Sequence, residues 1–344
     1  MNRDLLAVGV NNLIDRKHKL LFYVPEVPQA SGGIAVIYQM AKILSENNYE
    51  NVFILHKTIS YSAPTWLGSG YENLKHLCMD EGQVGVLPED FLIIPEGAGE
   101  IIIGSANLAC KRIILAQSWL YILNTLLPHK TWMSYGIKDA IAVNSTLALY
   151  IQNVFGKEIT VQVCRPSIPR YFAPNPQLKK LSVAISARDF MLGQNIIKNF
   201  YLKFPQYQDV VFKEMHNLSR QEFAIQLQEC CLGVWVDRAA GFGTFPIECA
   251  KTNTPFIGLL PDIIPEYAVE NSGIWTTDLL QIPTLIGQFL NAWINNEVPA
   301  ALLSGTQQLA QLYTVEEEQQ NVLTVFESYR TSRIFELEQQ FIKS

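Results

Sequence analysis

The sequence predicts an α/β protein with two Rossmann-like, doubly wound domains that face each other across a cleft. Short apolar runs of strand length alternate with helical patterns along most of the chain, as expected for parallel sheets covered on both faces. The length of 344 residues exceeds one ordinary core and favours two domains. A proline-rich stretch near the middle separates two αβ series of similar size.

The first half opens with a strand, a glycine turn and a helix. Residues 19–24 form an apolar run, and Gly32 and Gly33 then open a helix whose apolar positions keep helical spacing to Leu44. A second strand at 51–55 completes a parallel βαβ unit. Further strands are predicted at 91–94, 112–115 and 140–143.

A linker is predicted at residues 164–180, where four prolines exclude a helix interior or a central strand. A second αβ series follows. Its predicted strands are 181–185, 210–212, 232–236 and 256–259. Ser219 and Glu222 form a capping-box pattern that predicts a helix start between the second and third of these strands. We therefore expect an acceptor-side domain at 1–165, a nucleotide-sugar-binding domain at 166–320, and a C-terminal helix at 321–344 that packs back on the first domain.

Composition and charge exclude several classes of protein. Apolar residues make up 49% of the chain and charged residues 17%, which is typical of a globular protein. The formal charge of −6 argues against a nucleic acid as partner. The apolar region 113–127 is too short and too polar to span a bilayer, and Met1 to Leu5 lack the long apolar segment of a signal peptide. Six cysteines without CxxC spacing fit core positions in a reducing cytoplasm, which is the expected location.

The most informative segment follows the strand 232–236. Gly241 and Gly243 flank Phe242 and allow the backbone to approach a ligand closely. Thr244 is a candidate N-cap of a short helix, whose start would attract an anion. Glu248, one turn further on, can hold paired hydroxyls such as those of a ribose. The combination predicts a nucleotide diphosphate at the carboxyl edge of a parallel sheet.

Several segments in order resemble the nucleotide-sugar glycosyltransferases of the GT-B fold, most closely those of family 4. They are Ser31–Gly33, Ala142–Ser145, Pro166–Pro174, Gly241–Glu248, Thr254–Gly258, Pro265–Tyr267 and Asn271–Gly273. The resemblance runs from Lys19 to about Asp278. It implies transfer of a sugar from a nucleotide diphosphate sugar, with retention of configuration and without a metal ion.

For the donor side, the resemblance implies that Glu248 binds the ribose and that the Gly241–Thr244 backbone lies near the sugar phosphate. Glu266 corresponds to the family's next loop, where it contacts the nucleotide or caps the following helix. The family's other glutamate is replaced by Ala240, which puts the contact with the transferred sugar in doubt.

Two basic residues are candidates for neutralising the departing diphosphate. Arg188 matches the family's arginine, and its alternative is a surface ion pair with Asp189. The family's lysine position falls on Gly193, so Lys213 is proposed as its substitute. On the acceptor side, Gly32 and Gly33 match the family's glycine loop, and their alternative is a simple turn.

Gln117 stands where the family has a histidine. The acceptor itself is unidentified and can be a glycan, a lipid-linked glycan, a protein or a small molecule. No cofactor and no metal site are expected, because the sequence has no DxD pair and its five histidines do not cluster.

Two other functions stay open at this point. A non-catalytic binding or scaffold protein that keeps the fold is the main alternative, and Ala240 motivates it. An NAD-dependent oxidoreductase is disfavoured because no GxGxxG follows the first strand.

Overall fold

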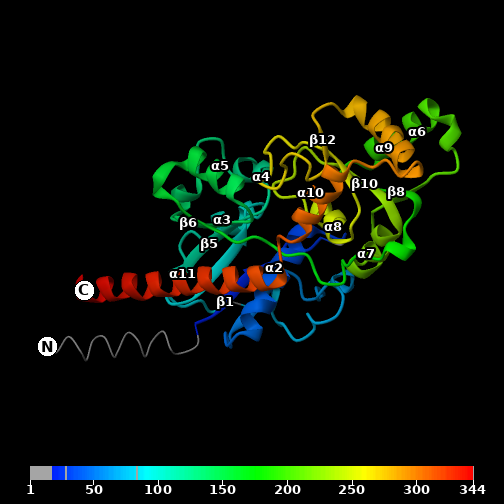
Figure 1. Ribbon diagram of the computed structural model, residues 1–344. Coiled ribbons are helices and arrows are strands. Elements are labelled where there is room, and N and C mark those ends of the chain that lie inside the picture. Colours follow the sequence, from blue (N-terminus) through cyan, green and yellow to red (C-terminus); the bar gives the residue numbers. More distant parts are fainter. Residues whose placement is uncertain (1–17, 28, 83, 344) are drawn as a thin grey trace. The chain divides into compact units, whose positions relative to one another are not determined.

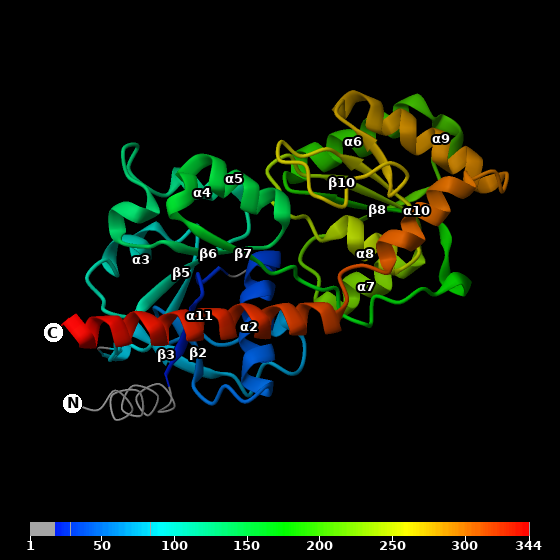
Figure 2. The ribbon, with the colours of Figure 1, turned by 60° about the vertical axis from the view of Figure 1, so that its left-hand side comes forward.

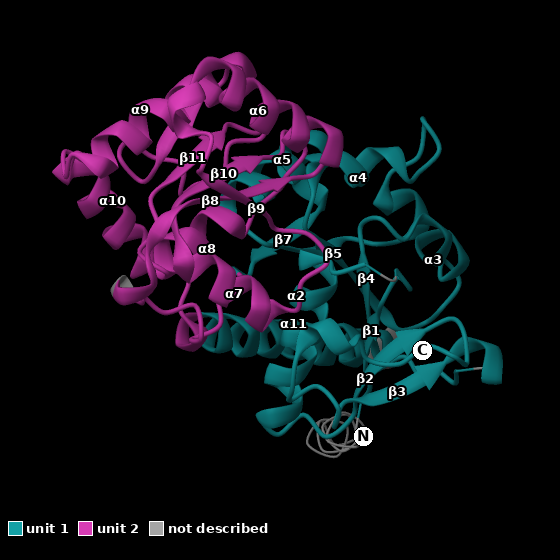
Figure 3. Ribbon diagram, turned by 90° about the vertical axis from the view of Figure 1, so that its right-hand side faces the viewer, with its two compact units in different colours: residues 1–165, 318–344 teal, residues 166–317 magenta. Residues whose placement is uncertain are grey.

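The computed structural model describes residues 18–27, 29–82 and 84–343, so the N-terminal segment from Met1 to Leu5 lies outside it. The chain divides into two compact units, which Figure 3 colours separately. Unit 1 comprises residues 1–165 and 318–344, and unit 2 comprises residues 166–317. Each unit is an α/β body with its own parallel sheet, which confirms the predicted fold class (Figure 1).

Within the described residues, unit 1 contains a seven-stranded sheet in the order β3-β2-β1-β4-β5-β6-β7. All neighbouring strands in it are parallel. Its strands are β1 (Leu20–Tyr23), β2 (Val52–His56), β3 (Lys75–Cys78), β4 (Phe91–Pro95), β5 (Lys111–Ala116), β6 (Asp139–Ala142) and β7 (Thr160–Val163). The chain order reverses between β1 and β4, which places a topological switch point there.

Helices cover both faces of this sheet. They are α2 (Gly32–Glu46), α3 (Gly99–Gly104), α4 (Trp119–Asn124), α5 (Ser145–Phe155) and α11 (Val315–Lys343). Figure 2 shows α3, α4 and α5 on one face and α2 with α11 on the other. This follows from right-handed crossovers that run in opposite directions from the switch point.

Unit 2 contains a five-stranded parallel sheet in the order β12-β11-β10-β8-β9. Its strands are β8 (Lys180–Ala187), β9 (Val211–Glu214), β10 (Cys230–Val236), β11 (Phe256–Leu259) and β12 (Ile274–Thr276). Its helices are α6 (Phe190–Lys203), α7 (Arg220–Glu229), α8 (Phe245–Lys251), α9 (Ile282–Ile294) and α10 (Ala300–Ala310). In Figure 2, α6 and α9 lie on one face of the sheet, and α7 and α8 lie on the other.

Local sequence signals explain where several helices begin. Asn144 caps α5 by accepting a hydrogen bond from the Leu147 amide at 2.7 Å. The predicted capping box of Ser219 and Glu222 is present at the start of α7. Short 3₁₀ turns connect other elements, and the proline-rich stretch after Arg165 contains only such a turn.

Three short strands, β3, β7 and β12, were not predicted from the sequence patterns. Each has only three or four residues, and most of their side chains are partly exposed. Such strands lack the continuous apolar run that identifies a fully buried strand.

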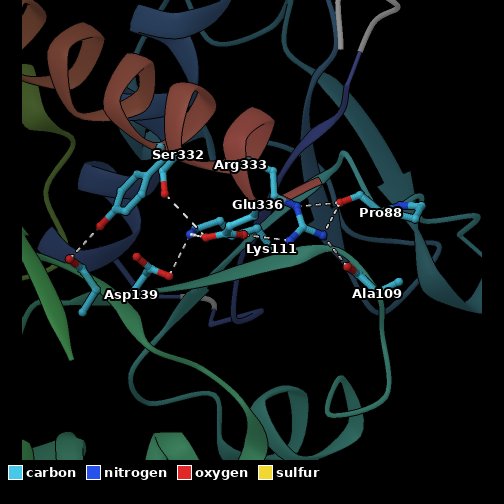
Figure 4. A network of polar contacts seen from close by, with 9 residues as sticks. Pro88, Ala109, Lys111, Asp139, Ser332, Arg333 and Glu336 are labelled. Carbon is cyan, nitrogen blue, oxygen red and sulfur yellow. Dashed lines mark hydrogen bonds and ion pairs between the residues drawn. The ribbon is translucent and has the colours of Figure 1, made fainter. Parts of the chain in front are cut away.

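The C-terminal helix α11 is anchored to unit 1 by charged side chains at the amino edge of the sheet (Figure 4). The ammonium group of Lys111 is 2.8 Å from Glu336 on the helix and 3.0 Å from Asp139 on β6. Burial raises the pKa of Asp139, although Lys111 opposes the shift. Arg333 donates to the carbonyl oxygen of Pro88 at 2.6 Å. These contacts hold one face of the helix against the start of β5 and the loop that contains Pro88.

All six cysteines are buried and free, as expected for core positions. In the part of the chain that the structure describes, we find no helix with the length and apolar character needed to cross a bilayer. The same residues contain no group of three or more metal-ligating side chains.

Candidate functional site

The loop between β10 and α8 is the centre of the candidate site in unit 2. It leaves the carboxyl end of β10, which lies between β8 and β11 in the sheet. Parallel doubly wound sheets bind their ligands outside the carboxyl ends of such strands. The loop therefore lies where the sequence pattern predicts a nucleotide.

Main-chain geometry in this loop depends on glycine. Gly243 has φ +72°, and a Cβ atom built on it would lie 2.2 Å from the ring of Trp235. Tyr267 donates its hydroxyl to the carbonyl oxygens of Phe242 at 2.5 Å and Gly243 at 2.6 Å. The Tyr267 hydroxyl therefore holds the main chain of the loop. The Trp235 ring leaves room only for glycine at position 243.

The Phe242 ring contributes to this support and does not face outward. It is 5% exposed and packs edge-to-face against Tyr267 and Tyr313. Tyr313 also donates to the Glu266 carboxylate at 3.3 Å. Phe242 can thus serve a ligand through its main chain, whereas Glu266 belongs to the cluster that holds the loop.

Thr244 occupies the cap position of α8, but its side chain makes no capping hydrogen bond because the backbone there is already helical. Pro246 lies in the first turn, as expected. Since α8 has only seven residues, its dipole is short, and an anion at this edge needs a further source of positive charge.

Arg188 supplies positive charge at the same edge. It directly follows β8, and its Nε is 2.8 Å from Oδ1 of Asp237, which directly follows β10. The predicted alternative partner, Asp189, instead caps α6 by accepting from the Met191 amide. The Arg188 side chain is 47% exposed, so it remains accessible to a ligand.

The structure does not bring Lys213 to this edge, which corrects its assignment as a substitute cation. Lys213 forms an ion pair with Glu229 at the end of α7. Glu229 also pairs with Lys180, the first residue of β8, at 3.5 Å. The Lys213 ammonium is therefore directed toward the amino edge of the sheet. This direction depends on the register of the four-residue strand β9 against β8.

Glu248 is held in a buried ion pair that the sequence did not reveal. The residue is 1% exposed, and its Oε1 lies 2.8 Å from Nη1 of Arg220 on α7. The Arg220 guanidinium also lies 5.3 Å from the ring centre of Phe172. Burial alone would lower the pKa of Arg220, but Glu248 and the Tyr171 hydroxyl raise it. A ribose can reach Glu248 only if Arg220 shares or releases the carboxylate.

In unit 1, the predicted acceptor-side residues lie together. The helix α2 begins at Gly32, and a Cβ atom on Gly33 would lie 3.3 Å from the side-chain amide of Gln117. Gln117 directly follows β5 and is partly buried. Gly32 has open space at the position that a Cβ would take, with no heavy atom of the described residues within 4 Å apart from its chain neighbours and its own helix backbone.

Sequence reasoning missed Glu96, a buried carboxylate beside these residues. It directly follows β4 and is 3% exposed. Its Oε1 accepts the backbone N–H of Ser118 at 2.6 Å. Burial raises the pKa of Glu96 to about 7. A single signal in the sequence marks it, a charged residue immediately after the apolar run Phe91–Pro95.

Comparison with known proteins shows the fold. No family model matches the sequence, and no curated protein matches it. Among solved structures, a sucrose-phosphate synthase from Thermosynechococcus elongatus has a TM-score of 0.64 at 11% identity over 95% of this chain and 100% of its own. Anabaena HepE in complex with UDP and glucose has a TM-score of 0.64 at 13% identity over 90% of this chain and 99% of its own.

The pneumococcal O-GlcNAc transferase GtfA, in complex with UDP and GlcNAc, has a TM-score of 0.52 at 10% identity. The match covers 72% of this chain and 57% of GtfA, so the chain spans little more than half of that protein. These neighbours are GT-B glycosyltransferases, and the two parallel sheets match their fold.

Proposed function

We propose that this protein is a glycosyltransferase that uses a nucleotide diphosphate sugar as donor. The observation that carries the proposal is the glycine loop at the carboxyl end of β10 with Arg188 beside it, in a fold shared with glycosyltransferases. Uridine is the base to test first, because HepE and GtfA were solved with UDP.

In this proposal, Arg188 neutralises the charge that builds on the departing diphosphate. Arginine matches the geometry of phosphate oxygens, and preplaced positive charge is an effective way to stabilise a leaving group. Asp237 holds the guanidinium at the end of β8 until a phosphate competes for it. Arg238, the next residue, is exposed at the same edge and is a second candidate for this role in place of Lys213.

The loop main chain from Gly241 to Thr244 would lie along the sugar phosphate, with two of its carbonyl oxygens already bound by Tyr267. In unit 1, Gln117 and the start of α2 at Gly32 and Gly33 would contact the acceptor. Transfer would proceed with retention and without a metal ion, as the resemblance to family 4 implies, and the protein would work in the cytoplasm.

The test is a titration of UDP, GDP and ADP and of their sugars, followed by assays of transfer and donor hydrolysis. Arg188→Gln should weaken nucleotide binding by about 1.5–3 kcal/mol, the range for a hydrogen bond to a charged group. Lys213→Gln is the matched control. It removes a cation from the same sheet whose side chain is directed toward the amino edge, so it should leave binding unchanged. Equal losses in both variants would contradict the assignment of Arg188.

A second candidate function is non-catalytic nucleotide binding on the same fold. Two observations favour it. Ala240 stands where the family has a glutamate, and the Glu248 carboxylate is already paired with Arg220. Tight binding of a nucleotide sugar, without transfer to any acceptor and without hydrolysis, would support this function over the first.

A further inference from the structure

The buried carboxylate of Glu96 lies at the switch point of the unit 1 sheet. It follows β4, which pairs with β1 on one side and β5 on the other. The loop after β1 leads to α2, and the loop after β4 leads to α3 on the other face. Crevices at such a point are where doubly wound sheets bind ligands.

Glu96 fastens the turn between β5 and α4 through several hydrogen bonds. Its carboxylate accepts the backbone N–H groups of Ser118 and Gln117. Its own amide donates to the carbonyl oxygen of Leu115 at 3.2 Å. Its carbonyl oxygen accepts the hydroxyl of Thr125 at 3.0 Å. Both ends of α4 are therefore tied to this one residue.

The fastened turn carries the Gln117 side chain to the start of α2. The amide lies against Gly33, where any larger residue would press on it at 3.3 Å. Glu96, Gln117 and Gly33 thus connect the carboxyl ends of three adjacent strands. The position of the Gln117 amide depends on a turn that Glu96 holds.

A buried carboxylate at this position carries an energetic cost that a neutral side chain would avoid. Burial raises the pKa of Glu96 to about 7, and the N–H groups of Ser118 and Gln117 offset only part of that effect. A glutamine would fill the same space without the cost of a buried charge. The ionised form can accept N–H groups with either of its two oxygens, whereas a glutamine side chain has one accepting oxygen and an NH₂ group that can only donate.

We propose that Glu96 is a positioning residue for the acceptor, which holds the Gln117 amide beside Gly33 where it hydrogen-bonds a hydroxyl group of the acceptor. The inference rests on the proposed function and extends it to the acceptor side, since it identifies a hydroxyl-bearing acceptor and the residue that orients its contact. Glu96 itself is covered by the turn, and it acts through Gln117.

Titratable groups on the elements around Glu96 are Glu100 in the first turn of α3, Tyr121 on α4 and Tyr23 at the end of β1. Glu100 is exposed at the surface of unit 1 and lies outside the hydrogen bonds that hold the turn. Burial raises the pKa of Tyr23, and Glu26 and Glu100 add to the shift. Tyr23 therefore stays neutral near pH 7, and Glu100→Gln is the matched control for Glu96→Gln.

The test uses Trp119, the first residue of α4, as a reporter next to the turn. The protein is labelled with 5-fluorotryptophan, and the Trp119 resonance is assigned with Trp119→Phe. In the wild type and in Glu100→Gln, this resonance should shift with pH with a midpoint near 7. In Glu96→Gln, the titration should be lost, and Glu96→Asp should keep a titration of reduced amplitude.

Enzymatic turnover provides the second readout. Glu96→Gln should bind UDP as the wild type does and should keep its KM for the donor, but transfer should fall at least about tenfold below pH-matched wild type. Unchanged transfer by folded Glu96→Gln overturns the proposal, as does a Trp119 resonance that is the same in Glu96→Gln and in the wild type at every pH, since the turn would then not depend on this carboxylate. If the wild type binds no nucleotide, the proposed function fails, and the fluorine titration still decides the role of Glu96 in the turn.

Discussion

The ion pair of Glu248 and Arg220 allows a prediction whose size follows from the structure. Glu248 has a side chain that is 2% exposed, and Arg220 has one that is 20% exposed. Arg220→Gln therefore leaves a carboxylate with almost no access to water. Breaking a buried pair in this way costs about 3–5 kcal/mol of the free energy of unfolding.

Glu248→Gln should cost less than Arg220→Gln. The guanidinium that it leaves behind is partly exposed and keeps its contacts with Tyr171 and the ring of Phe172. The double variant has no unpaired charge, so its cost should be smaller than the sum of the two single costs by about 2 kcal/mol or more, as expected for coupled neighbours.

The assay is guanidinium denaturation, with hydrogen exchange of peptides from α7 and α8 to report on unit 2 alone. Two units need not unfold together, so the exchange data decide which transition belongs to the pair. Costs below about 1 kcal/mol for both single variants, or costs that simply add, would refute the reasoning that the pair is buried and coupled.

The same variants separate stability from ligand binding. If Glu248 binds the ribose, the double variant should regain stability but still bind UDP about 1–3 kcal/mol more weakly than the wild type. Normal UDP binding by a folded double variant would instead show that Glu248 holds Arg220 and nothing else.

Three further predictions follow from other parts of the chain. Gly243→Ala should destabilise unit 2 by at least about 2 kcal/mol and weaken UDP binding, because φ at this position is +72° and the Trp235 ring fills the space that a Cβ would take. Gly32→Ala is the control and should fold normally. Calorimetry on both variants measures the difference. Lys111→Met leaves the largely buried Asp139 without its cation, so it should cost about 3 kcal/mol and speed hydrogen exchange in the second half of α11. The native pKa of Glu96 is about 7 against an ordinary 4.5, so the native state binds more protons between these values and stability falls as pH rises through this window. Glu96→Gln should remove this fall, a difference of about 3 kcal/mol at pH 8 in denaturant titrations, and parallel pH profiles would contradict it.

The sequence predicts the sheets well because their central strands contain short, continuous apolar runs. The run at 232–236 is buried along its whole length, and the glycine turn before α2 lies where the pattern places it. Periodicity did not identify the edge strands β3, β7 and β12, since they are partly exposed and have few residues. The fold class therefore follows from local patterns alone.

The partners of the site residues could not be predicted, since they come from distant parts of the chain. Arg188 pairs with a residue 49 positions away, and Glu248 pairs with one 28 positions away. Both pairs exist only because β8, β10 and the helices around them are neighbours in space. A polar residue at a strand end is visible in the sequence, whereas the charge that faces it is set by the order of the strands.

The central claim, a nucleotide at the carboxyl edge of unit 2, is tested most directly by hydrogen exchange with and without saturating UDP. Slower exchange should concentrate in peptides that cover residues 188–192 and 237–248, and Arg188→Gln should reduce it at the same UDP concentration. Saturable binding of UDP that leaves these peptides unchanged, or protects only the sheet of unit 1, would contradict the account.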